Sequence, residues 1–216
     1  MRYDAVIFDL DGTLLNTLDD LADSVNAAMR EFSLPLKNID EVRDNVGNGG
    51  RRLIAGVVPG GETNPRFEEI LAYYVPYYQA HCRIKTKPYD GVLPLLAKLR
   101  EEGILLAIVS NKGDGAVKEL SREYFQDLVC EAVGEREGIR RKPAPDSVAE
   151  AMRLMQVTPE ETLYIGDSEV DYETAANAGV PCALVTWGFR GREALAQIHP
   201  DYLIDHPQQL TKLICG

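Results

Sequence analysis

Short apolar runs recur along this chain, and each ends in glycine or polar residues. Runs of about four to eight residues that are rich in Val, Ile and Leu and bounded by turn-forming residues are typical of buried strands. The pattern therefore predicts strands at residues 5–10, 104–109, 162–165, 182–186 and 202–204, together with a less regular strand at residues 128–133.

Between these runs, apolar residues return at the spacing of an amphipathic helix. This spacing predicts helices at residues 92–100, 115–124, 145–155 and 170–178. Strands that alternate with helices pair in parallel through right-handed crossovers. We therefore expect an α/β fold, with a doubly wound, Rossmann-like parallel sheet that is covered by helices on both faces.

The alternation stops between residues 16 and 86, where the sequence contains no convincing strand. Apolar residues recur there at helical spacing, first from Leu18 to Met29 and again from Phe67 to Tyr78. A turn containing proline and glycine, at residues 85–91, leads back to the alternating pattern. We expect a catalytic core of residues 1–15 and 87–216 and an inserted, all-helical cap domain of residues 16–86.

The charge of the chain limits its partners. The formal net charge is -11 and the isoelectric point is near 4.8, so we expect it to bind neither nucleic acid nor an anionic membrane. A small anionic substrate stays compatible, because one site needs only local cations or a metal. No signal-peptide pattern and no long apolar segment is present, and the scattered cysteines suit a reducing compartment. We expect a cytoplasmic protein.

Polar side chains follow three of the expected strands at the point where each strand ends. They are Asp9 and Asp11 at the first, Ser110, Asn111 and Lys112 at the second, and Asp167, Ser168 and Asp171 at the third. Ligands of open parallel sheets gather at the carboxyl ends of the strands. Two carboxylates at positions i and i+2 face the same side and repel each other unless a cation or a shared proton compensates. The pattern indicates a reaction site supported by a metal ion.

These groups suit phosphoryl transfer. An aspartate can attack phosphorus and become an aspartyl-phosphate. Mg2+ prefers oxygen ligands, which carboxylates and a substrate phosphate would supply. Gly12 lets the backbone approach a phosphate closely, and the hydroxyl of Ser110, the amide of Asn111 and a lysine could hold phosphate oxygens. Lys142 is one candidate, although it belongs to a short basic run, Arg140 to Lys142, of the kind that is usually solvated.

The chain resembles the haloacid dehalogenase superfamily. Its four motifs are matched in order by Asp-x-Asp-Gly-Thr at 9–13, Ser-Asn at 110–111, Lys-Pro at 142–143 and Gly-Asp-Ser-x-x-Asp at 166–171. The resemblance spans the whole chain and includes a helical cap between the first two motifs. Val46-Gly47-Asn48-Gly49 and Ser110-Asn111-Lys112 make the chain most similar to the phosphoglycolate-phosphatase-type members.

The resemblance implies a role for each acidic residue. Asp9 would be the nucleophile, and Asp11 would protonate the leaving oxygen and then help to activate water. Asp9, the backbone carbonyl of Asp11 and Asp167 would hold Mg2+. Asp171 would either bind the metal directly or support the residues that do.

The resemblance also implies how the phosphoryl group is held. Ser110, Asn111 and Lys142 would bind it, and Lys142 would offset the charge of Asp9. In the cap, Gly47 to Arg52 is either a turn with solvated arginines or a substrate-facing loop in which Arg51 meets a second anionic group. The sequence leaves this choice open.

The function indicated is a Mg2+-dependent phosphatase that acts on a small, phosphoglycolate-like phosphate monoester. A sugar phosphomutase or an inorganic pyrophosphatase could use the same scaffold, and a phosphate-binding regulatory protein without turnover is the alternative from another class. A dehalogenase is disfavoured because it does not need the acid at Asp11. The physiological ester and the oligomeric state cannot be read from the sequence.

Overall fold

The structure is a computed structural model that describes residues 3–216. The chain divides into two compact units. One comprises the chain as far as Leu15 and from Pro88 onward, and the other comprises Asn16–Lys87. Each unit is described by itself below.

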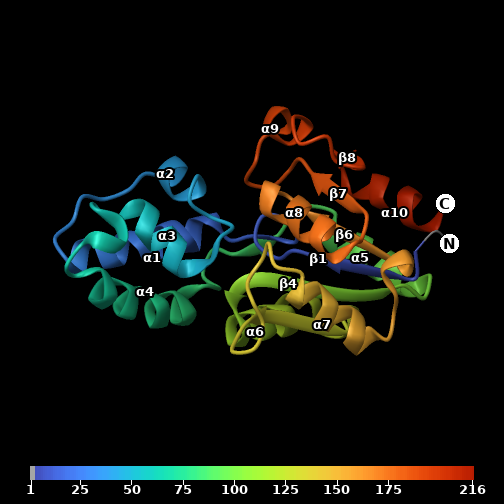
Figure 1. Ribbon diagram of the computed structural model, residues 1–216, viewed down its shortest axis with the longest axis horizontal. Helices are drawn as coiled ribbons and strands as arrows, with labels where there is room; N and C mark the ends of the chain where they lie inside the picture. Colours follow the sequence, from blue (N-terminus) through green and yellow to red (C-terminus); the bar gives the residue numbers. More distant parts are fainter. Residues whose placement is uncertain (1–2) are drawn as a thin grey trace. The chain divides into compact units, whose positions relative to one another are not determined.

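The larger unit is built on a six-stranded parallel sheet in the order β5-β4-β1-β6-β7-β8 (Figure 1). The strands are β1 (Ala5–Phe8), β4 (Leu105–Gly113), β5 (Glu131–Glu135), β6 (Thr162–Gly166), β7 (Cys182–Val185) and β8 (Tyr202–Ile204). Every residue of β1 and β6 is buried, as expected of parallel strands covered on both faces. The predicted α/β class and parallel sheet are confirmed.

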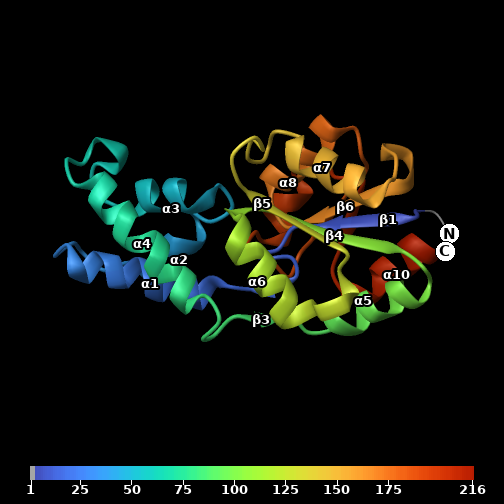
Figure 2. The ribbon, with the colours of Figure 1, turned by 90° about the horizontal axis from the view of Figure 1, so that it is seen from below.

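Helices cover both faces of this sheet, with α7 and α8 on one face and α5, α6 and α10 on the other (Figure 2). The helices of this unit are α5 (Val92–Glu101), α6 (Asp114–Phe125), α7 (Asp146–Met155), α8 (Glu169–Ala178), α9 (Arg192–Ala196) and α10 (Pro207–Cys215), with short 3-10 turns η2 (Gln126–Leu128) and η3 (Pro159–Glu161). One part of the core packs Ile7, Val109 and Tyr164 of the sheet against Val148 and Met152 of α7. This packing fixes the strand ends on which the site is built.

The order of the strands reverses at β1. The chain runs outward from β1 through β4 to β5, and then returns to the other side of β1 for β6, β7 and β8. Phe8 lies opposite Ile108 of β4 and Ile165 of β6, so Asp9 emerges where the apolar part of β4 and the strand β6 both end. Such a switch point is where open parallel sheets bind ligands.

Two strands differ from the predicted bounds. β4 continues to Gly113 rather than ending at residue 109, and its pairing with β5 shifts register between Val109 and Gly113. The polar residues 110–112 therefore belong to the strand, although the apolar pattern alone placed its end at residue 109. β5 begins at Glu131, because Leu128 at the start of the predicted strand closes the turn η2.

The smaller unit is mostly helical, with α1 (Leu18–Glu31), α2 (Ile39–Arg43), α3 (Gly49–Val57) and α4 (Phe67–His81), and the short turn η1 (Gly61–Thr63). The apolar face predicted from Leu18 to Met29 is the buried face of α1, and α1 packs against α4. The carboxylate of Asp20 caps the end of this unit by accepting hydrogen bonds from the backbone amides of Lys85 and Thr86. A two-stranded sheet of β2 (Leu15–Asn16) and β3 (Lys87–Pro88) was not predicted.

Across residues 3–216, no helix combines the length and the apolar character needed to cross a membrane. The cytoplasmic location and the expected lack of nucleic-acid and membrane partners stay predictions from the sequence.

Candidate active site

A buried lysine links two carboxylates at the carboxyl end of the sheet. The Nζ atom of Lys142 lies 2.6 Å from Oδ1 of Asp9 and 2.7 Å from Oδ1 of Asp171, and it donates a hydrogen bond of 3.1 Å to the hydroxyl of Tyr164. The side chains of Lys142 and Asp9 are 3% and 9% exposed. Since water is largely excluded, each charge depends on its partners.

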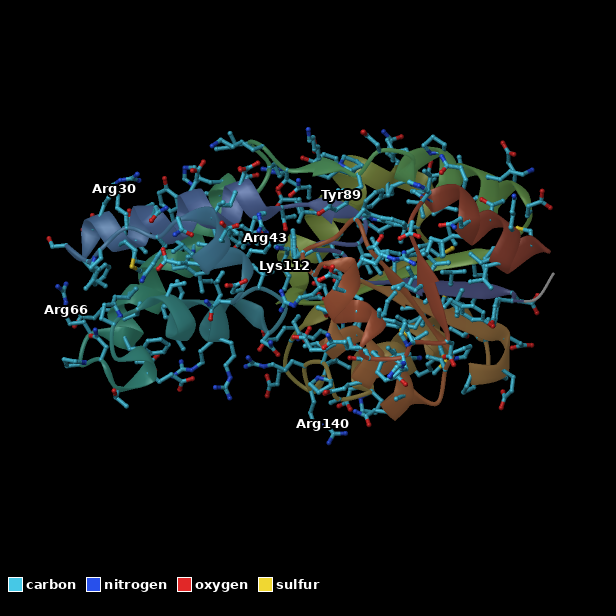
Figure 3. All side chains as sticks on the ribbon, turned by 90° about the horizontal axis from the view of Figure 1, so that it is seen from above. Arg30, Arg43, Arg66, Tyr89, Lys112 and Arg140 are labelled. Carbon is cyan, nitrogen blue, oxygen red and sulfur yellow. The ribbon has the colours of Figure 1, made fainter. Side chains whose placement is uncertain are left out.

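The backbone around Lys142 is held by Asn111. The side-chain amide of Asn111 donates to the carbonyl oxygen of Lys142 at 3.1 Å and accepts from its N–H at 2.7 Å. Arg140 lies two residues away in the same basic run, but it is exposed and pairs with Asp146 (Figure 3). The basic run is therefore exposed at Arg140 and buried at Lys142, where Asn111 binds the backbone and the ammonium contacts Asp9 and Asp171.

Asp167 is a buried carboxylate with one hydrogen bond on each oxygen. The hydroxyl of Thr13 donates to Oδ1 at 3.2 Å, and the backbone N–H of Phe189 donates to Oδ2 at 2.7 Å. Gly12 has a φ of +90°, and a Cβ atom there would lie 2.3 Å from Oδ2 of Asp167. The glycine expected to admit a phosphate therefore also makes room for Asp167.

Asp171 has donors on both oxygens. Oδ1 accepts from Lys142 and, at 2.8 Å, from the hydroxyl of Tyr164. Oδ2 accepts from the backbone amides of Asp167 and Ser168 and from the hydroxyl of Ser168 at 2.6 Å. Ser168 is the N-cap of α8, which explains locally why Asp171 turns back towards the strand end.

Burial changes the ionisation of this group of carboxylates. Burial raises the pKa of Asp9 to about 7, with Lys142 acting against the rise and Asp171 adding to it. Burial likewise raises the pKa of Asp167 well above its ordinary range. Although burial opposes it, Lys142 holds the pKa of Asp171 below its usual value. Asp171 and Asp9 raise the pKa of Lys142 in spite of its burial, so the ammonium stays charged.

Asp11 lies beside a second lysine. Its Oδ1 atom is 2.9 Å from Nζ of Lys112, and the two side chains are 13% and 8% exposed. Lys112 extends from the end of β4 (Figure 3), and its backbone N–H donates to the buried hydroxyl of Ser110 at 3.2 Å. The two lysines of the site thus serve different aspartates.

Arg51 belongs to the smaller unit, where α3 and α4 pack together. Its guanidinium donates to both carboxylate oxygens of Glu68, at 2.5 and 3.1 Å, and lies 4.9 Å from the centre of the Phe67 ring. The Arg51 side chain is 38% exposed. The guanidinium is therefore held by its own unit, and its expected contact with a substrate stays a proposal.

Comparison with known proteins identifies the family of the chain. The family model for haloacid dehalogenase-like hydrolases matches residues 6–185, which include every residue of the site described above except Phe189. The chain belongs to the haloacid dehalogenase-like hydrolase family. The predicted resemblance is confirmed.

Relatives within this family cover nearly the whole chain. The N-acetylmuramic acid 6-phosphate phosphatase of Pseudomonas aeruginosa is 30% identical, over 99% of this chain and 96% of that protein. The phosphoglycolate phosphatase of Thiobacillus denitrificans is 33% identical, over 87% of this chain and 86% of that protein. A crystal structure from Lactobacillus delbrueckii subsp. bulgaricus, provisionally assigned as a phosphoglycolate phosphatase, has a TM-score of 0.94 at 34% identity and covers 99% of both chains.

The residues of this hydrolase fit a divalent metal ion. Asp9, Asp167 and Asp171 each offer one oxygen atom, and these atoms lie within 4.8 Å of one another. When all are ionised, these three acids and Asp11 carry four negative charges, against the two positive charges of Lys142 and Lys112. Arg190, near Asp167, is paired with Glu169. A divalent cation such as Mg2+ would balance the remaining two negative charges, and it prefers hard oxygen donors of this kind.

The sequence analysis assigned no role to three groups of the site. The hydroxyl of Tyr164 stands in an otherwise apolar strand, and a buried hydroxyl needs a partner, so this residue could have been noticed. Lys112 follows Ser110-Asn111 directly and could have been tested as a partner of Asp11. The N–H of Phe189 is a backbone group, so the type of residue at this position gave no indication of its contact with Asp167.

Proposed function

We propose that this chain is a Mg2+-dependent phosphatase that hydrolyses a small phosphate monoester through an aspartyl-phosphate on Asp9. The observation that carries the proposal is the bridge from Lys142 to Asp9 and Asp171, next to Asp167. A lysine in this position offsets the charge of an attacking carboxylate and of an incoming phosphate. The names of the relatives from Pseudomonas aeruginosa and Thiobacillus denitrificans support the same reaction class.

In the first half of the proposed reaction, an oxygen of Asp9 forms a bond to phosphorus while the bond from phosphorus to the ester oxygen breaks. Asp11 gives its proton to the departing oxygen. In the second half, the same carboxylate takes a proton from water as that water attacks the aspartyl-phosphate, which returns Asp9 and releases inorganic phosphate. The Lys142 ammonium stays against Asp9 throughout and binds the phosphoryl oxygens together with Ser110.

We propose that Asp9, Asp167 and the backbone carbonyl of Asp11 hold the metal. Bound Mg2+ would neutralise the charge of the phosphate and align it with Asp9. Asp171 already accepts hydrogen bonds on both oxygens from five donor groups, so we assign it to the support of Lys142 rather than to the metal. The side chain of Asn111 binds the Lys142 backbone, so we assign it to the positioning of that lysine.

We propose 2-phosphoglycolate or a similarly small ester as the substrate class. N-acetylmuramic acid 6-phosphate is the second candidate, because the relative from Pseudomonas aeruginosa that bears this name matches over almost the full length of both chains. In the smaller unit Arg51 is the proposed contact for a second anionic group of the substrate.

The test is a steady-state assay of inorganic phosphate release with Mg2+. It compares 2-phosphoglycolate, N-acetylmuramic acid 6-phosphate, glucose 1-phosphate, pyrophosphate and p-nitrophenyl phosphate, ranked by kcat/KM. We expect one ester to lead, and EDTA or Asp9→Asn to abolish turnover. An isomerised sugar phosphate without phosphate release would indicate a phosphomutase, and preference for pyrophosphate an inorganic pyrophosphatase. Binding without turnover of any ester would favour a regulatory protein and refute the proposal.

A further inference from the structure

The segment that follows β7 touches the site although no motif of the sequence pointed to it. This segment, Trp187-Gly188-Phe189, is called the clamp segment below. It lies on the larger unit, just beyond the last residue of β7, Val185. Its three residues make three separate contacts with Asp167 and with the loop after β1.

The first contact is the hydrogen bond from the Phe189 N–H to Oδ2 of Asp167, at 2.7 Å. The second is the hydrogen bond from the Trp187 indole N–H to the carbonyl oxygen of Thr13, at 3.0 Å. The hydroxyl of Thr13 in turn donates to Oδ1 of Asp167. The clamp segment therefore reaches one carboxylate oxygen directly and the other through Thr13.

The third contact is the close approach of Gly188. A Cβ atom at this position would lie 2.4 Å from Cβ and 2.4 Å from Oδ2 of Asp167, and 2.4 Å from the carbonyl oxygen of Gly12. The Cβ atom of Asp167 is bonded directly to the backbone, and the oxygen of Gly12 is a backbone atom. Neither can rotate out of the way. Gly12, in the loop after β1, approaches the same carboxylate, since a Cβ atom there would lie 2.3 Å from Oδ2 of Asp167. The Asp167 carboxylate is thus confined between two glycines.

Asp167 keeps capacity for a further partner, in contrast to Asp171. Each carboxylate oxygen can accept about two hydrogen bonds; Oδ1 of Asp167 accepts one from Thr13, and Oδ2 accepts one from Phe189. Groups that orient a metal ligand in this way alter metal affinity by roughly 10- to 100-fold when they are changed.

We infer that the clamp segment positions Asp167 for the divalent cation and so sets the affinity of the site for Mg2+. This inference rests on the proposed function, because it takes Asp167 as a metal ligand. Gly188 and Trp187 act through Asp167 and Thr13, and are positioning residues. Changes in the clamp segment should weaken metal binding more than they slow a site that is saturated with metal.

The experiment measures the Kd for Mg2+ by isothermal titration calorimetry of the full chain, without substrate. Gly188→Ala is expected to raise the Kd roughly 10- to 100-fold, while kcat at saturating Mg2+ changes less than the Kd does. Gly191→Ala is the matched control, since a Cβ atom there meets nothing within 4 Å and the φ of Gly191 is -72°. Trp187 is the only tryptophan of the chain, so its emission gives an independent titration of wild type and Gly188→Ala.

A Kd for Gly188→Ala within about twofold of the wild-type value would overturn the inference, as would an equal loss in Gly191→Ala. Circular dichroism shows whether Gly188→Ala is folded. If it is not, Trp187→Phe decides, because it removes the N–H donor to Thr13 and keeps an aromatic ring at this position. A Kd raised about two- to tenfold then supports the inference, and an unchanged Kd overturns it. Phosphate release by the wild type tests the proposed function separately. A wild type that binds no Mg2+ would refute both the inference and the proposed function.

Discussion

The ammonium of Lys142 and the carboxylate of Asp9 lie 2.6 Å apart in a place where both side chains are almost completely buried. Removing one partner of a buried ion pair leaves the other charge uncompensated. Lys142 also holds Asp171, so its loss would expose two acids to each other.

We expect Lys142→Met to lower kcat by roughly 10²- to 10³-fold and to destabilise the fold by about 3–5 kcal/mol. Phosphate release and urea unfolding measure the two effects. Arg140→Met is the control from the same basic run. It removes only an exposed pair with Asp146 and should leave the urea midpoint and kcat as they are in the wild type. Equal effects of the two substitutions would contradict the assignment of Lys142.

Asn111 offers a test of positioning against direct phosphate binding. Asn111→Ala leaves the buried N–H and C=O of Lys142 without their partner, so we expect a loss of about 1–3 kcal/mol in the free energy of unfolding. Asn111→Asp keeps the acceptor for the N–H but places a carboxylate oxygen against the carbonyl, and should not rescue activity. If Asn111→Ala instead raised KM at unchanged stability, the side chain would be a substrate ligand and our assignment would be wrong.

Tyr164 can be tested by removing a single oxygen. Tyr164→Phe keeps the buried ring and deletes the hydroxyl between Lys142 and Asp171. We expect a loss of stability of about 0.5–1.5 kcal/mol and a decrease in kcat of about two- to tenfold, because the ammonium loses one of its three partners. The Kd for Mg2+ should stay at the wild-type value, which separates this residue from the clamp segment. A weaker Mg2+ affinity would show that the two networks are not independent.

The metal-free protein should lose stability as pH rises. Burial raises the pKa of Asp9 to about 7 from an ordinary value of 3.8. Between these values the folded chain binds a proton that the unfolded chain has released. The contribution of Asp9 to stability is therefore complete below about pH 4 and lost as pH approaches about 7. In thermal unfolding with EDTA, the Tm of Asp9→Asn should rise relative to the Tm of the wild type as pH increases over this window. Parallel Tm curves for the two proteins would contradict the raised pKa.

Arg51 and Glu68 form a pair that can be separated by substitution. If Arg51 binds a second anionic group of the substrate, Arg51→Met should raise KM for 2-phosphoglycolate roughly tenfold or more, as expected for a lost charged hydrogen bond. KM for p-nitrophenyl phosphate should not change. Glu68→Gln should not raise KM for either ester, because it weakens only the partner that holds the guanidinium. If Arg51→Met changed KM equally for both esters, or for neither, the role of Arg51 would be confined to contacts within its own unit.

The sequence predicted the parallel sheet and the elements of the core because apolar periodicity reports burial directly. Asp9, Ser110 and Asp167 could be expected at strand ends for the same reason. Periodicity could not reveal the partners of these groups. By position alone Lys142 is one of three cations in a basic run; the family resemblance singled it out, and the structure shows its backbone paired with Asn111. The residues that meet at Asp167 come from loops that no local pattern joins.

The limits of β4 illustrate the same point in the sheet. Ser110 to Lys112 are polar, so the apolar run ends at Val109, yet the strand continues to Gly113. Its polar end is stabilised by groups of the site, such as the carboxylate that pairs with Lys112 and the backbone that pairs with Asn111. A strand that ends in a reaction site is thus longer than its hydrophobic part.

The hydrogen bond from Thr13 to Asp167 joins residues that are 154 positions apart in the chain. During synthesis Asp9 precedes Lys142, Asp167 and the clamp segment by 133 residues or more. Contacts of such long range form late, since the entropy of closing the intervening loop must first be overcome. A nascent or truncated chain that lacks these later segments therefore carries Asp9 without the groups that surround it in the folded unit, and we expect phosphate release only when the sheet is complete.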